Sequence, residues 1–144
     1  FVFMLPDTGE PDIENIVWTK ASRWRKKKGY VETIYKRKRF LPDINSHNAI
    51  VRGYAERNAI NAPIQGSAAD IIKVAMVRIF NRFETEGLKS KMILQVHDEL
   101  LIETAKEELP RVEKLLCDEM MHAADLRVKL EVDVHSGKDW YEAK

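Results

Sequence analysis

Residues 91–103 read Lys-Met-Ile-Leu-Gln-Val-His-Asp-Glu-Leu-Leu-Ile-Glu, two apolar runs on either side of three ionisable side chains. The runs, Met92–Val96 and Leu100–Ile102, have the length of strands and are too short for typical helices. The pattern predicts a β-hairpin with His97, Asp98 and Glu99 at its tip.

The predicted tip departs from the usual chemistry of a hairpin turn. Two-residue connections favour glycine because the backbone needs positive φ there, and Asp98-Glu99 contains none. Departures of this kind concentrate at functional sites. Two adjacent carboxylates beside an imidazole suit a hard divalent cation such as Mg²⁺. An ordinary solvated turn explains this stretch equally well.

The length of 144 residues corresponds to one domain with a real core. With 44% hydrophobic and 33% charged residues the chain should be soluble and folded. The one cysteine, Cys117, excludes an internal disulfide and a cysteine-based zinc cluster, and it fits the cytoplasm. The apolar residues 1–5 are too few for a signal peptide or a membrane span. Because the chain begins with Phe1, we expect a fragment of a longer protein.

Charge is unevenly distributed along the chain. Residues 23–39 carry nine basic side chains and one acid, a local charge of +8, which leaves −7 for the rest of a chain whose total is +1. A separated basic patch is typical of proteins that bind polyanions. A solvated loop without a partner is the alternative.

Apolar residues at helical spacing predict helices over about 12–28, 49–60 and 63–86, with Gly29 and Gly87 ending the first and the third. Pro63 suits the first turn of a new helix. A further helix begins either at Thr104, which forms a capping box with Glu107, or near Leu109. Pro110 favours the later start, because a proline in the second turn would remove a hydrogen bond.

Two other segments read as extended. Residues 30–41 predict a hairpin that folds at Lys36-Arg37, and residues 128–135 alternate strictly between apolar and polar side chains, as a half-buried strand does. Together these elements predict an α+β fold. It has a small, mostly antiparallel sheet, made of the 91–103 hairpin and the C-terminal strand, with helices on one face and a basic extended segment before it.

Four segments, which follow one another along the chain in the family's order, resemble the family A DNA polymerases, the bacterial DNA polymerase I group. Residues 95–100 (Gln-Val-His-Asp-Glu-Leu) resemble the signature hairpin of that family, its motif C. The other three segments are residues 55–73, residues 29–33 with 40–43, and residues 137–140. The resemblance implies that residues 29–144 are the C-terminal part of a palm domain and that residues 1–28 are a poorly matched end of the fingers region.

The resemblance also implies roles for individual residues. Asp98 would hold magnesium for nucleotidyl transfer to a primer 3′-hydroxyl, with Glu99 beside it. By resemblance, His97, Gln65, Arg57 and Asn61 would contact primer–template DNA. The charge of the basic segment, apart from the resemblance, adds Arg37, Lys38 and Arg39 to the expected DNA contacts. A helix that carries glutamine and arginine can test the minor-groove acceptors that every base pair offers.

The chain departs from the family pattern at three places. Lys36 stands where relatives usually carry glycine, residues 1–28 follow the family only loosely, and two upstream motifs are missing. Those motifs supply a second metal-binding aspartate and most of the deoxynucleoside triphosphate site. We therefore expect half a catalytic site and no activity from the chain alone. The alternatives are a remnant that binds primed DNA without chemistry and, less well supported, a metal-dependent hydrolase.

Overall fold

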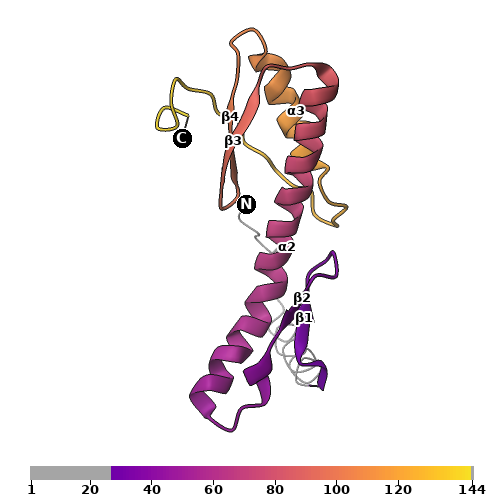
Figure 1. The fold of residues 1–144 in the computed structure, drawn as a ribbon, viewed down its shortest axis with the longest axis vertical. Helices are drawn as coiled ribbons and strands as arrows, with labels where there is room; N and C mark the ends of the chain where they lie inside the picture. Colours follow the sequence, from indigo (N-terminus) through magenta and orange to yellow (C-terminus); the bar gives the residue numbers. More distant parts are fainter. Residues whose placement is uncertain (1–26, 144) are drawn as a thin grey trace. The chain divides into compact units, whose positions relative to one another are not determined.

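The computed structural model describes residues 27–143, which divide into two compact units, residues 27–70 and 71–143. Most of the helix predicted over 12–28 lies outside the described residues. Residues 27–28 are helical, and Gly29 follows with a φ of 70°, as expected of a glycine that ends a helix. Helix α2 (Ala49–Glu86) contributes residues to both units (Figure 1).

The unit of residues 27–70 begins with an antiparallel hairpin of β1 (Tyr30–Glu32) and β2 (Lys38–Phe40). The predicted hairpin is confirmed, but its loop spans residues 33–37 and turns at residues 34–35, before the predicted position. The Thr33 N–H donates to the Arg37 carbonyl at 3.0 Å and closes the loop. Lys36 has a φ of 64°, a left-handed conformation that favours glycine.

The hairpin and a short 3-10 helix, η1 (Pro42–Asn45), pack against the first half of α2. Alanines on α2 allow this close approach, because a small side chain leaves room for another backbone to pack near the helix. The buried cluster consists of Val31, Leu41, Ile44, Ala55, Ala59 and Ala62.

Helix α2 runs without a break from Ala49 to Glu86, so the prediction of two helices that meet at Pro63 is wrong. A proline inside a helix removes one hydrogen bond and costs about 3 kcal/mol. Buried side chains of α2 lie on both sides of Pro63, in the cluster that contains Ala59 and in the one that contains Ile71. This packing outweighs the local cost, which the sequence pattern alone could not weigh.

The unit of residues 71–143 contains the hairpin of β3 (Lys91–Val96) and β4 (Glu99–Glu103), followed by α3 (Leu109–Met121) (Figure 1). The hairpin predicted from residues 91–103 is confirmed. One face of it contributes Met92, Leu100 and Ile102 to a core built on α2 and α3. The centre of that core includes Ile79 and Val112, which are 0% and 1% exposed.

The predicted strand over 128–135 is not paired. In the described part of the chain the sheets are two separate two-stranded hairpins, so the three-stranded sheet is wrong. The alternation holds from Lys129 onward: Leu130 is buried, Val132 and Val134 pack against the core, and Lys129 and Glu131 are exposed. Val128, predicted on the covered face, is 56% exposed. Alternation reports that one face of an extended segment is covered, and it does not require a hydrogen-bonded neighbour.

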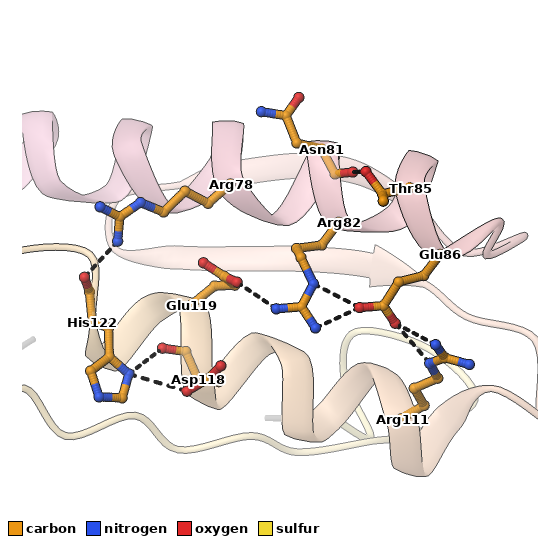
Figure 2. A network of polar contacts seen from close by, with 9 residues as sticks. All are labelled: Arg78, Asn81, Arg82, Thr85, Glu86, Arg111, Asp118, Glu119 and His122. Atoms are coloured by element: carbon orange, nitrogen blue, oxygen red, sulfur yellow. Dashed lines mark hydrogen bonds and ion pairs between the residues drawn. The ribbon is translucent and has the colours of Figure 1, made fainter.

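Polar contacts join α2 and α3 (Figure 2). Arg82 donates to Glu86 at 2.7 Å and to Glu119 at 2.9 Å, and Arg111 donates to Glu86 at 2.8 Å. The hydrogen bond from Arg82, helped by Arg111, lowers the pKa of the Glu86 carboxyl. The Arg82 side chain is 43% exposed, so water screens these pairs. We therefore attribute the stability of this unit mainly to its apolar core.

Helix α3 begins at Leu109 with Pro110 in its first turn, which confirms the later of the two predicted starts. Glu108, just before the helix, accepts hydrogen bonds from the Lys89 N–H at 2.9 Å and from the Ser90 hydroxyl at 2.7 Å. Its carboxylate therefore ties the start of α3 to the segment that leads into β3.

The architecture is α+β with two small antiparallel sheets and helices. In the unit of residues 71–143, helices cover one face of the β3–β4 hairpin, as predicted. Among residues 27–143 no helix combines the length and the apolar character that crossing a bilayer requires.

Candidate functional site

The tip of the β3–β4 hairpin carries the three ionisable residues singled out in the sequence. Val96 pairs with Glu99, so the two-residue connection is His97-Asp98 and Glu99 is the first residue of β4. The expected connection, Asp98-Glu99, was therefore one residue too late. His97 has a φ of 52°, in the left-handed region. Uncommon backbone conformations of this kind cluster at functional sites.

The tip is exposed, and the strand residues behind it pack against the core. His97, Asp98 and Glu99 are all exposed, whereas Leu100 and Ile102 behind them pack against the core of the unit. The Gln95 side-chain amide donates to the His97 carbonyl at 2.5 Å and braces the turn. The hairpin thus holds these exposed groups on a packed support.

Asp98 and Glu99 also line an open groove of about 1280 Å³ between the hairpin, α3 and the C-terminal segment. Glu131, Asp133 and His135 line it from the C-terminal side. The apolar residues Val132 and Val134 line it too, so this stretch of the C-terminal segment borders the same space as the two carboxylates of the tip.

The donor chemistry of the tip fits a hard cation, since Asp98 and Glu99 offer carboxylate oxygens. The number of donors does not complete a site. Within residues 27–143 no three side chains of His, Cys, Asp or Glu gather closely enough to hold a metal ion. Whether Asp98 and Glu99 bind a metal together with donors from elsewhere stays a prediction.

In the unit of residues 27–70, helix α2 carries Arg57, Asn61 and Gln65 at intervals of four residues. This spacing places them on one face of a helix, and all three side chains are exposed. The three residues expected to contact primer and template here therefore form one accessible polar stripe.

The basic run at 37–39 lies beside that stripe. Arg37, Lys38, Arg39 and Gln65 line one small cavity of about 80 Å³, together with Thr33, Ala62 and Gly66. The structure thus brings Gln65 and all three predicted basic residues together.

The three cations have different surroundings. The Arg37 guanidinium is 2.8 Å from the Asp70 carboxylate and donates to the Gly66 carbonyl at 3.1 Å. The Lys38 ammonium lies over the Tyr30 ring, 4.7 Å from its centroid. Arg39 is exposed on β2. Sequence reasoning assigned no role to Asp70, because nothing local shows that it meets a residue 33 positions earlier.

Comparison with known proteins matches residues 11–142 to the family model for DNA polymerase family A. A DNA polymerase I from Streptococcus pneumoniae is 50% identical over 134 residues, which are 93% of this chain and 15% of that protein. One from Bacillus caldotenax is 52% identical over 132 residues, 92% of this chain and 14% of that protein.

A solved structure, the POL domain of Pol1 from M. smegmatis in complex with DNA primer-template and dNTP, matches with a TM-score of 0.86 and 45% identity. The match covers 90% of this chain and 23% of that one. The chain therefore spans about one seventh of the length of the curated relatives and under a quarter of the solved domain. From the family model and these relatives, we conclude that this chain belongs to DNA polymerase family A.

Proposed function

We propose that this chain takes part in DNA-templated DNA polymerisation as the C-terminal palm portion of a longer polymerase, acting in the cytoplasm in DNA replication or repair. The observation that carries the proposal is the exposed His97-Asp98-Glu99 tip, on a hairpin rooted in a packed core. It stands in a chain half identical to DNA polymerases I. The reaction adds a deoxynucleotide to a primer 3′-hydroxyl and releases pyrophosphate.

In this proposal the Asp98 carboxylate is a metal ligand, and Glu99 lies next to it at the start of β4. Magnesium, when bound by Asp98 together with donors from outside residues 27–143, supplies the Lewis acidity that activates the 3′-hydroxyl and stabilises the leaving group. The deoxynucleoside triphosphate would be bound mostly by residues outside this chain. His97, in its left-handed turn, would contact the growing end of the primer.

The exposed stripe of Arg57, Asn61 and Gln65 would contact the terminal base pairs from the minor groove. Each base pair offers acceptors there, so these donors can test the shape of a pair without reading its sequence. Lys38 and Arg39 would neutralise backbone phosphates. DNA binding should therefore be independent of sequence and steeply dependent on salt.

A second candidate is a module that binds primed DNA without chemistry. The observation that favours it is the lack of any gathering of three metal-ligating side chains within residues 27–143. Two magnesium ions need carboxylates from both sides of a site. In the family, the carboxylate of the other side comes from a motif upstream of the segments that this chain matches.

Primer extension with purified chain, primed DNA and magnesium tests the proposal, with Asp98→Ala as the control for a contaminating polymerase. We expect no extension, because positioning of the reactants alone supplies about 7–11 kcal/mol of a barrier and the nucleotide site is incomplete. Extension that disappears in Asp98→Ala would show that the chain is a complete enzyme.

The catalytic role is tested in a longer polypeptide that contains this chain and the missing motifs. Asp98→Asn should lower single-turnover incorporation at least about tenfold while affinity for primed DNA stays nearly constant. A smaller loss would contradict the metal-ligand role and favour the module that only binds DNA.

A further inference from the structure

We propose that Asp70 is a positioning residue for DNA binding. Through Arg37 it holds the β1–β2 hairpin against the turn of α2 that carries Gln65, so that Arg39 and Gln65 meet DNA in a fixed arrangement. The proposal rests on the proposed function. It assigns Asp70 a role and makes Arg37 an internal link in place of a phosphate contact.

The link between Arg37 and Asp70 is short and sheltered at one end. The Arg37 Nε donates to the Asp70 Oδ1 at 2.8 Å, and its Nη2 lies 2.8 Å from the same oxygen. The Asp70 side chain is 11% exposed, and its Oδ2 is enclosed without a hydrogen-bond partner among the described residues. A carboxylate so enclosed is costly unless it is paired, and Arg37 supplies the paired charge.

Further contacts tie the same two segments together. Arg37 also donates to the Gly66 carbonyl at 3.1 Å, and the Ile34 N–H donates to the Ser67 hydroxyl at 3.0 Å. A Cβ on Gly66 would lie 2.7 Å from the Thr33 methyl group, so the hairpin loop touches the backbone of α2 there. The loop is thus docked on the helical turn that follows Pro63.

This docking fixes the spacing between two exposed groups that the proposed function uses. Gln65 precedes Gly66 on α2, and Arg39 lies two residues after Arg37, on β2. Both line the cavity of about 80 Å³ at this junction. When the loop is released, Arg39 and Gln65 are still present, but their separation is no longer fixed before DNA binds. DNA binding must then also order these two groups, which weakens it.

Positioning and simple electrostatics predict opposite signs for one substitution. Removing a negative charge close to a DNA-binding surface should tighten binding, because the carboxylate repels phosphates. If Asp70 acts through Arg37, Asp70→Asn should instead weaken binding although the charge becomes more favourable. The salt dependence separates the roles of the arginines, since each phosphate contact adds about 0.9 to the slope of log affinity against log salt.

The experiment measures binding of the chain to a fluorescent primed duplex by anisotropy at several salt concentrations. Asp70→Asn is compared with Asp43→Asn, an exposed acid of the same unit that serves as the matched charge control. Arg37→Gln is compared with Arg39→Gln. Ser67→Ala is a milder release of the loop that changes no charge, and circular dichroism checks that each variant is folded.

We expect Asp70→Asn to weaken binding about threefold to tenfold with an unchanged salt slope, and Ser67→Ala to weaken it about twofold to threefold. Arg37→Gln should weaken binding with little change in slope, whereas Arg39→Gln should flatten the slope by about one. If Asp70→Asn does not fold, the proposal is tested by Ser67→Ala and the two arginine variants. A Ser67→Ala chain that binds primed DNA as tightly as the parent overturns the proposal.

Three further results would overturn the positioning role of Asp70. One is binding by Asp70→Asn as tight as that of Asp43→Asn, and another is a slope change in Arg37→Gln equal to that in Arg39→Gln. Either leaves the proposed function intact if Arg39→Gln still flattens the slope. The third, a chain that binds no primed DNA at low salt, removes the DNA-binding part of the proposed function, and the positioning role falls with it.

Discussion

Replacing Ile79 by alanine should destabilise the unit of residues 71–143 by about 2–5 kcal/mol. Ile79 is 0% exposed, in a core shared by α2, α3 and one face of the β3–β4 hairpin. Alanine removes three carbons, worth about 2.4 kcal/mol at about 0.8 kcal/mol each, and the cavity that remains adds to the loss. Because this core supports the hairpin, a loss of this size should also loosen the tip that carries Asp98.

Urea unfolding followed by circular dichroism measures the change, with Val77→Ala as the matched control on the same helix. Val77 is 61% exposed, so its truncation should alter the unfolding free energy by less than about 0.5 kcal/mol. A loss below about 1 kcal/mol in Ile79→Ala, or equal losses in the two variants, would refute the reasoning, because α2 would then not be anchored through this face.

Three further predictions follow from single contacts and conformations. Lys36→Gly should stabilise the chain by about 0.5–1 kcal/mol in the same urea assay, because it relieves the left-handed φ of 64°, and a loss of stability would contradict this. Hydrogen bonds from the Lys89 N–H and, next in size, from Ser90 lower the pKa of the Glu108 carboxyl. The stability that ionised Glu108 contributes is therefore complete above the ordinary carboxyl pKa, and it is lost as the pH falls through the lowered pKa of the folded state. Glu108→Gln should therefore flatten the acid side of a plot of melting temperature against pH, and an unchanged plot would refute it. In a complete enzyme, Gln65→Ala and Arg57→Ala should each raise the activation free energy of primer extension by about 1–3 kcal/mol, and by different amounts on matched and mismatched primers. Equal effects on both primers would indicate that these side chains serve packing and not contact with DNA.

The β3–β4 hairpin could be predicted from residues 91–103 because both of its causes are local. Two apolar runs of strand length need one buried face, and a two-residue connection needs an unusual backbone conformation. The structure shows both, with Leu100 packed on the core and His97 at a φ of 52°. The position of the turn was one residue off, since neither His97 nor Asp98 is a residue type that marks such a turn strongly.

Two of the wrong predictions, the helix break at Pro63 and the third strand, failed for a shared reason. Continuation of α2 through Pro63 depends on buried clusters before and after it, and the C-terminal segment lacks a neighbouring strand although its faces alternate. In each case the local signal was real, and the outcome was decided by residues distant in the sequence. Proline predicts a lost hydrogen bond and alternation predicts a covered face, but neither predicts which partners are available.

The basic run shows the same limit at the candidate site. Arg37, Lys38 and Arg39 are equivalent in the sequence, where each adds one charge to a patch that predicts polyanion binding. In the structure Arg37 and Arg39 are both exposed, but the guanidinium of Arg37 is paired with the sheltered carboxylate of Asp70. The charge of a patch therefore overstates the charge that it offers to a ligand whenever a partner from another element neutralises part of it. If the chain binds DNA as proposed, the salt slope of that binding, and not the count of basic residues, will measure how many of these cations reach phosphate.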